Sequence, residues 1–160
     1  MGKTSSKRIL NVDVKRMVDD QPDTSWLGQF SNRAESDYAI NHRERSGDRR
    51  AYEWFNPCVE NYKGEPEKDI RKYCEQDYQR MVSLDNGAWC FYGIEAVADV
   101  QFNSDVVQTV RSGGLWGVES DSEASYLTSI ENDQLAELRD QLRSMGFSTR
   151  AITKAFAEEL

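Results

Sequence analysis

The sequence holds few of the residues that build metal centres and disulfide frameworks. It has one histidine, His42, and three cysteines, Cys58, Cys74 and Cys90, none of which belongs to a C-x-x-C pair. Structural zinc sites combine four Cys or His ligands, and disulfide scaffolds need a dense, even set of cysteines. We therefore expect no metal cluster, no disulfide framework and no cofactor.

Long apolar stretches are also missing. No run of about 18 apolar residues occurs, and the chain begins with polar residues instead of an apolar signal core. We therefore expect a cytoplasmic protein without a membrane partner. The 160 residues, 38% of them hydrophobic, suffice for one packed domain, which we place at residues 8–160 after a flexible N-terminus of residues 1–7.

Positive charge is scarce relative to negative charge, and the net charge is -8. The basic residues gather at the start of the chain and in an island at residues 42–50, and the remainder is acidic. Affinity for nucleic acid comes chiefly from Lys and Arg, so direct nucleic-acid binding is not expected. Acidity favours a basic protein partner or simply keeps the chain in solution. Glu44 and Asp48 lie inside the basic island, which we expect to form ion pairs within the chain.

The periodicity of apolar residues predicts an α+β fold. Alternation predicts strands at residues 8–18, 88–102 and 106–118, and helices are predicted to start near Pro66, Ser122 and Ser148. We expect an antiparallel sheet of three to five strands with helices packed on one face and a helical hairpin at the end. Residues 26–64 have weak periodicity, which is typical of an irregular layer or a binding loop, with a short strand at 51–55.

The strand at 8–18 is expected to be half-buried. Its apolar residues Leu10, Val12, Val14 and Val18 would share one face, because alternate side chains of a strand point the same way.

A glycine pair interrupts the last predicted strand just before Trp116. Gly113 and Gly114 could cradle a phosphate, but a phosphate loop carries Lys followed by Ser or Thr, and here Glu119 and Asp121 follow. We favour a bulged strand end with a buried Trp116. The alternative is a recognition surface built around this tryptophan.

Two other classes of function remain open. The loop carboxylates of Asp19, Asp20 and Asp23 could join those of Glu119 and Asp121 to form a metal-dependent enzyme acting on a phosphate-bearing substrate. His42 could serve as a base, although its arginine neighbours indicate an exposed basic loop. A nucleic-acid-binding regulator would instead use the basic residues 3–16 and the terminal helices.

The segment DTSWLG at residues 23–28, together with residues 112–121, resembles a family of uncharacterised proteins encoded by bacteriophages and plasmids. The resemblance implies an accessory protein of a mobile element that acts on host defence. We therefore interpret the chain as a non-enzymatic acidic binding protein, an anti-CRISPR or anti-restriction inhibitor in the host cell, whose partner is a host protein with a basic nucleic-acid-binding surface. Its predicted contact residues are aromatic or acidic: Trp116, Trp26, Trp54, Glu119, Asp121, Glu123, Glu131, Asp133 and Glu137.

Overall fold

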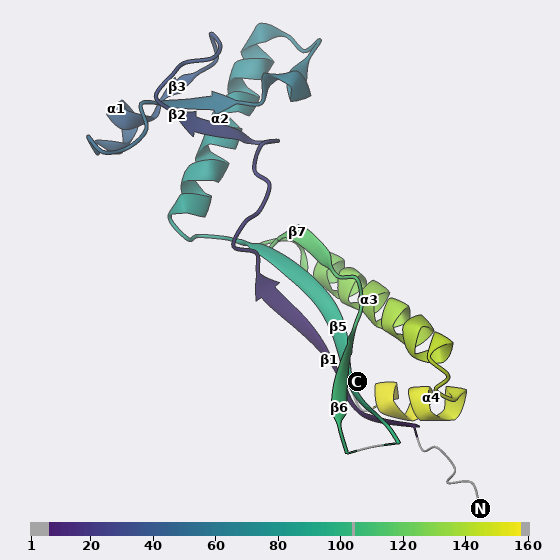
Figure 1. Cartoon of the computed structure of the whole chain (residues 1–160). Helices are drawn as coiled ribbons and strands as arrows, with labels where there is room; N and C mark the ends of the chain where they lie inside the picture. The colour runs from purple at the N-terminus through teal and green to yellow at the C-terminus, as the bar shows by residue number, and fades with distance from the viewer. Residues whose placement is uncertain (1–6, 104, 158–160) are drawn as a thin grey trace, which may run out of the picture. The chain divides into compact units, whose positions relative to one another are not determined.

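The computed structural model describes residues 7–103 and 105–157. The chain divides into two compact units: a sheet–helix unit, formed by Met1–Asp20 and Cys90–Leu160, and an inserted unit, Gln21–Trp89 (Figure 1). Whether residues 8–160 behave as one domain stays a prediction. Lys7, expected in a flexible terminus, is instead the first residue of a strand, and residues 1–6 lie outside the described residues.

The sheet–helix unit contains a four-stranded antiparallel sheet. Its central strand is β5 (Phe91–Phe102), which pairs along its length with β1 (Lys7–Val18). The other edge of β5 pairs first with β6 (Val107–Arg111) and then with β7 (Leu115–Glu119). The predicted last strand is therefore one hairpin arm that breaks in the middle.

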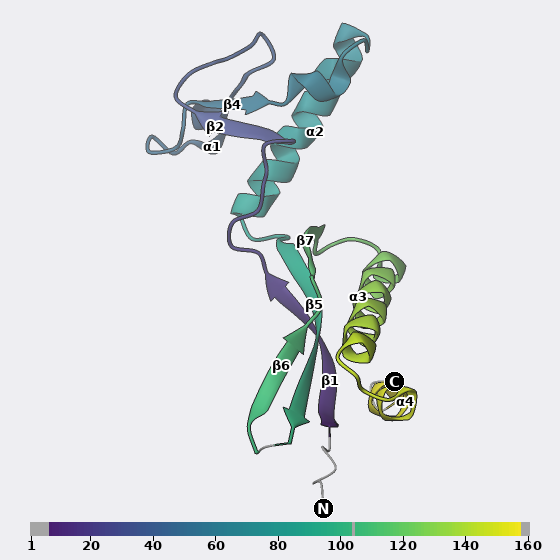
Figure 2. The same ribbon diagram turned by 45° about the vertical axis from the view of Figure 1, so that its right-hand side comes forward.

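Two helices cover one face of this sheet (Figure 2). The long α3 (Ala124–Ser144) packs against β5, and α4 (Thr149–Ala157) packs against β1. Their apolar stripes meet the inward residues of the strands in a core formed by Val12, Ala96, Ala98, Val100, Leu138, Leu142, Phe147, Ile152 and Phe156. The predicted α+β fold with an antiparallel sheet and helices on one face is confirmed for the helices expected near Ser122 and Ser148. The helix expected near Pro66 was also predicted to cover this sheet, but it belongs to the inserted unit and packs against the strands there.

The turn between α3 and α4 is closed by a glycine cap. Gly146 has a φ of 90°, its N–H donates to the Arg143 carbonyl at 3.0 Å, and the Phe147 N–H donates to the Leu142 carbonyl at 3.1 Å. This pair of bonds is the Schellman arrangement, which closes a helix by a residue in the left-handed conformation. Ser148 then accepts the Ala151 N–H at 3.1 Å, so it caps α4 as the sequence predicts.

The first strand differs from its predicted alternation at Leu10. The register shifts between Ile9 and Asn11, which leaves Leu10 as the extra residue of a β-bulge. Ile9 therefore packs against the core in its place, and Leu10 is 39% exposed. Val12 and Val14 face the core as expected, whereas Val18, at the end of the strand, is exposed.

The inserted unit has a small antiparallel sheet in the order β2 (Gly28–Ser31), β4 (Trp54–Pro57), β3 (Ile40–Asn41). Three helices accompany it: α1 (His42–Ser46), the short η1 (Val59–Tyr62) and α2 (Glu67–Asp85). Its buried apolar residues are Leu27, Phe55, Cys74, Tyr78, Met81 and Trp89. The short strand expected at 51–55 lies at 54–57, and β2 and β3 carry no periodic signal that predicts them.

The cysteines of this chain are free thiols. In residues 7–103 and 105–157, no helix combines the length and apolar character needed to cross a bilayer.

Candidate functional site at the break between β6 and β7

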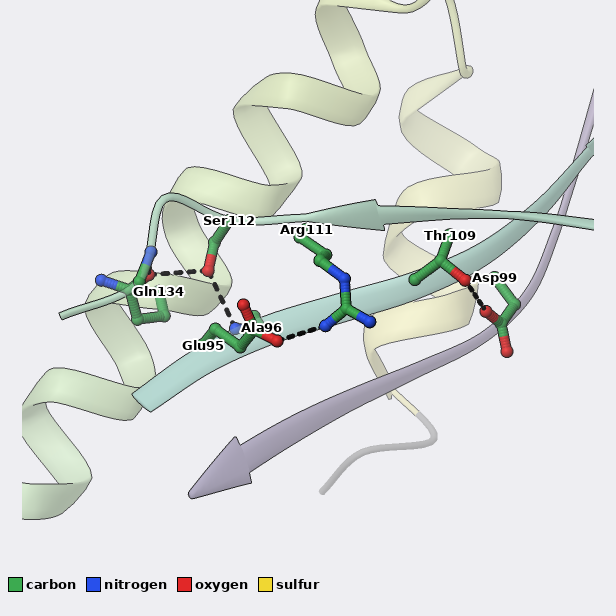
Figure 3. Close-up of polar contacts among 8 residues, drawn as sticks. Glu95, Ala96, Asp99, Thr109, Arg111, Ser112 and Gln134 are labelled. Carbon is green, nitrogen blue, oxygen red and sulfur yellow. Dashed lines mark hydrogen bonds and ion pairs between the residues drawn. The ribbon is translucent and has the colours of Figure 1, made fainter. Parts of the chain in front are cut away.

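Ser112 ends the pairing of β6 with β5 and begins a contact with α3 (Figure 3). Its N–H donates to the Ala96 carbonyl at 2.8 Å, and its hydroxyl oxygen accepts the Ala96 N–H at 2.9 Å. The same hydroxyl donates to Gln134 Oε1 at 2.6 Å. Because Ser112 and Gln134 are both more than 90% buried, this polar network is closed to solvent and needs each of its hydrogen bonds.

The two glycines after Ser112 continue the contact with α3. Gly113 donates its N–H to Glu137 Oε1 at 2.8 Å, and Gly114 donates to Gln134 Oε1 at 2.9 Å. Gly114 has a φ of 76°, a conformation that glycine adopts without steric cost. Side chains of α3 thus accept the backbone hydrogen bonds of the break. The sequence contains a sign of this role, since Gln134 lies between Ile130 and Leu138 on the apolar stripe of the helix.

Trp116 lies on the sheet face that α3 and α4 leave uncovered, directly over Gly93. A Cβ built at Gly93 would lie 2.2 Å from Cε3 of the indole, so only glycine accommodates the ring there. The expectation of a buried Trp116 is wrong, because 51% of the residue is exposed. The left-handed Gly114 and Gly117 and the register shift between Tyr92 and Ile94 explain the difference, since they interrupt the alternation that would turn the ring inward.

Polar side chains continue along the same face of the sheet. Glu95 is 8% exposed and forms an ion pair with Arg111, and Asp99 accepts the Thr109 hydroxyl at 2.9 Å (Figure 3). These pairs lie across the β5–β6 register and were not predicted from the sequence. The ion pair compensates the buried carboxylate of Glu95 on the face that carries Trp116.

Several of the predicted acidic contact residues have structural partners. Glu131 of α3 forms an ion pair with Arg16 of β1, and Glu137 accepts the Gly113 N–H described above. Asp133 is exposed on α3. Glu119 ends β7, Asp121 lies in the exposed turn that follows, and Glu123 is the N-cap residue of α3. The acids therefore lie in the same unit as Trp116, and Glu131 and Glu137 also stabilise that unit.

The other two predicted tryptophans belong to the inserted unit. Trp26 is 43% exposed, and its carbonyl accepts the Asn61 side-chain N–H at 2.6 Å. The turn before it is fixed by Asp23, whose carboxylate accepts the Ser25 hydroxyl at 2.6 Å and the Ser25 N–H at 3.0 Å. Both bonds lower the pKa of Asp23 below its usual range. Trp54 is half-buried in β4.

Trp54 lines a groove of about 590 Å³ within the inserted unit. Two arginines of the groove have internal partners: Arg45 binds Glu75 at 2.6 Å, and the Arg71 guanidinium carbon lies 5.0 Å from the centre of the Tyr38 ring. The hydrogen bond from Arg45 lowers the pKa of Glu75. The predicted pairing of the basic island within the chain is thus confirmed for Arg45, while the groove itself was not predicted.

His42 lies in an aromatic cluster and not in an exposed basic loop. Its Nδ1 is 2.9 Å from the Tyr78 hydroxyl, and its ring centre is 4.5 Å from that of Phe30. The loop prediction was wrong because His42 begins α1, which is capped by the Asn41 side chain, and turns inward. This arrangement gives His42 a role in packing.

The carboxylates proposed for a metal-dependent enzyme do not form a cluster. Asp23 belongs to the inserted unit, whereas Asp19, Asp20, Glu119 and Asp121 belong to the sheet–helix unit. Among the residues that the structure describes, no group of three or more His, Cys, Asp or Glu side chains is placed to hold a metal ion.

Comparison of the chain with protein-family models, with curated proteins and with solved structures gives no match. The function is therefore inferred from the geometry of the two units.

Proposed function

We propose that this is a non-enzymatic binding protein that contacts a partner protein through the face of its sheet–helix unit that carries Trp116. The observation that carries the proposal is that Trp116 is both exposed and held in place. Its exposed fraction is 51%, and its ring packs against Gly93. Tryptophan is enriched among the residues that dominate interface energies. An aromatic side chain that is already held in place loses little conformational entropy on binding, so more of its contact energy contributes to affinity.

The charge of the chain supports a basic partner. The net charge is -8, and the residues that follow Trp116 include Glu119, Asp121 and Glu123. Complementary charge accelerates association and suppresses the wrong partners. Proteins that bind nucleic acid carry suitable basic surfaces, because they must neutralise phosphates.

In the setting implied by the resemblance to phage and plasmid proteins, this partner is a nucleic-acid-processing complex of host defence. A CRISPR effector or a restriction enzyme has a phosphate-binding cleft of the required charge. The protein would act by occupying that cleft in the host cytoplasm.

The test is a quantitative pull-down from a nuclease-treated bacterial lysate, followed by reconstitution with the purified captured component. We expect Trp116→Ala to reduce binding of that component at least tenfold. Tyr52→Ala, which removes a 55% exposed aromatic residue from the inserted unit, is the matched control and should bind as the unaltered protein does. Equal binding of the two variants, or no component captured at stoichiometric amounts, would overturn the proposal.

A further inference from the structure

Strand β6 forms an open edge of the four-stranded sheet. The order of the strands is β1-β5-β6, and β6 pairs only with β5 among the described residues. The Ser112 N–H points to β5, where it donates to Ala96. Because backbone groups of an antiparallel strand point alternately to its two sides, the N–H and C=O groups of Val107, Thr109 and Arg111 point to the open edge.

This edge lacks lysine and proline, two of the features that prevent a sheet from pairing with another chain, and its one charged side chain, Arg111, forms an ion pair with Glu95. Natural edge strands are commonly protected by lysine, proline or a covering element. The sequence of β6 is VQTVR, with no lysine or proline, and Val107 is 50% exposed.

A groove of about 480 Å³ runs between this strand and α3 within the sheet–helix unit. It is lined by Val110, Arg111, Glu137, Asp140, Gln141, Ser144 and Met145. An edge strand beside a helix-lined groove is the geometry in which proteins bind extended peptides: the strand supplies main-chain hydrogen bonds and the groove accepts alternate side chains.

The polar groups of the groove favour a basic occupant. Glu137 and Asp140 contribute carboxylates from α3, whereas the guanidinium of Arg111 is engaged by Glu95. Asp140 also binds Arg143 at 2.9 Å, but both side chains are more than half exposed, and such ion pairs are weak.

We propose that the β6 edge binds an extended basic segment of a partner protein as an added strand. The main chain of the bound segment forms hydrogen bonds with the main chain of Val107, Thr109 and Arg111. A Lys or Arg side chain of the segment reaches the carboxylates of Asp140 and Glu137. A second copy of this chain fits less well, because each copy carries a net charge of -8 and the same acids. The inference rests on the proposed function only in taking the partner to be a basic protein, and it uses a different surface from Trp116.

The test uses a fluorescein-labelled octapeptide of alternating Lys and Val and its Glu and Val counterpart, with the full-length protein. Fluorescence anisotropy should detect binding of the basic peptide only. Asp140→Lys should weaken that binding at least fivefold. Asp133→Lys makes the same charge change on an exposed position of α3 outside the groove, and this variant should bind within twofold of the unaltered protein.

Amide hydrogen exchange measured by NMR locates the bound peptide. Saturating peptide should slow exchange at Val107, Thr109 and Arg111, whereas Gln108 and Val110, whose amides already face β5, should change little. No binding at millimolar peptide, equal losses in the two Lys variants, or unchanged exchange along β6 would each overturn the inference. Protection of β6 that rises with protein concentration without peptide would identify a second copy as the occupant and would also overturn it. A pull-down that fails while the peptide binds would count against the Trp116 surface alone.

Discussion

Trp116 covers Gly93 so closely that the two residues act as one structural unit of the outer sheet face. Three atoms of the indole lie within 2.5 Å of the position that a Cβ at residue 93 would take. The glycine leaves room for the ring, and the ring in turn shields the main chain of β5 from water. The same contact holds in place the aromatic group that we propose as the binding anchor.

Gly93→Ala should therefore displace the indole and destabilise the sheet–helix unit. Overpacking of a filled contact costs about 1–3 kcal/mol. Urea unfolding of Gly93→Ala, Trp116→Ala and the double variant measures the coupling. We expect the alanine at residue 93 to cost much less once the ring is gone; equal costs in both backgrounds would show that the contact is not the cause.

Gln134→Leu should destabilise the break between β6 and β7. The change leaves the buried Ser112 hydroxyl and the Gly114 N–H without their acceptor, and an unpaired buried polar group costs about 1–3 kcal/mol. Asn132→Leu, on an exposed position of the same helix, is the control and should alter the free energy of unfolding by less than about 0.5 kcal/mol. Equal unfolding curves for Gln134→Leu and the unaltered protein would contradict the assigned role.

Asp77→Asn should stabilise the inserted unit at neutral pH. Burial raises the pKa of Asp77 above its ordinary value of 3.8, so ionisation of this carboxyl opposes folding. The penalty is present above the raised pKa and disappears as the pH falls below 3.8. In the unaltered protein the Tyr62 hydroxyl donates a hydrogen bond to the Asp77 carboxylate at 2.5 Å, and the side-chain oxygen of the asparagine can still accept this bond.

The measurement is urea unfolding of Asp77→Asn at pH 3, 5 and 7. We expect the gain in unfolding free energy at pH 7 to shrink to nothing at pH 3. Asp69→Asn removes the same charge from the first turn of α2, where an acid favours the helix, and should lose stability at pH 7. A loss of stability in Asp77→Asn at pH 7 would refute the assignment.

Gly146→Ala should weaken the α3–α4 corner. Its φ of 90° lies in the left-handed region, where an L side chain costs roughly 1–2 kcal/mol, and a Cβ would come within 2.4 Å of Lys7 Nζ. Gly146→Asn should cost less than the alanine, because asparagine tolerates this conformation better. Thermal unfolding should rank the three proteins as Gly, Asn, Ala in falling Tm, and an alanine variant as stable as the parent would argue against the cap.

The regular parts of the fold could be predicted from the sequence because their apolar residues repeat with a fixed period. Helix α3 buries one face, and the residues of β5 that pack against the helices stand at alternate positions, so both patterns survive in the order of the residues. The bulge at Leu10 could not be predicted, since one extra residue in a strand leaves its composition unchanged. The inserted unit was harder to predict from the sequence. The Asn56 side chain binds the Glu35 N–H at 2.9 Å and the Arg33 carbonyl at 2.8 Å, and hydrogen bonds of this kind between a side chain and a loop leave no periodic pattern in the sequence.

The candidate site could also be predicted only in part from the sequence. The glycine pair and the acids near Trp116 are adjacent in the sequence, so this segment could be identified as a candidate site from the sequence. The direction of the indole depended on the left-handed glycines on each side of it, and its platform, Gly93, lies on another strand. The groove beside β6 depends on which edge of the sheet stays open, which is a property of strand order and not of any local segment.

The insertion of residues 21–89 between two paired strands also bears on how the protein is made. Val18 pairs with Tyr92, and the Asp19 N–H donates to the Phe91 carbonyl at 2.8 Å. The two strand ends that flank the insertion are therefore hydrogen-bonded neighbours. A ribosome adds roughly 5–20 residues per second. Strand β1 therefore waits several seconds, with both of its edges unpaired, until its neighbour is synthesised. During this interval the inserted unit can fold first and bring the two strands together.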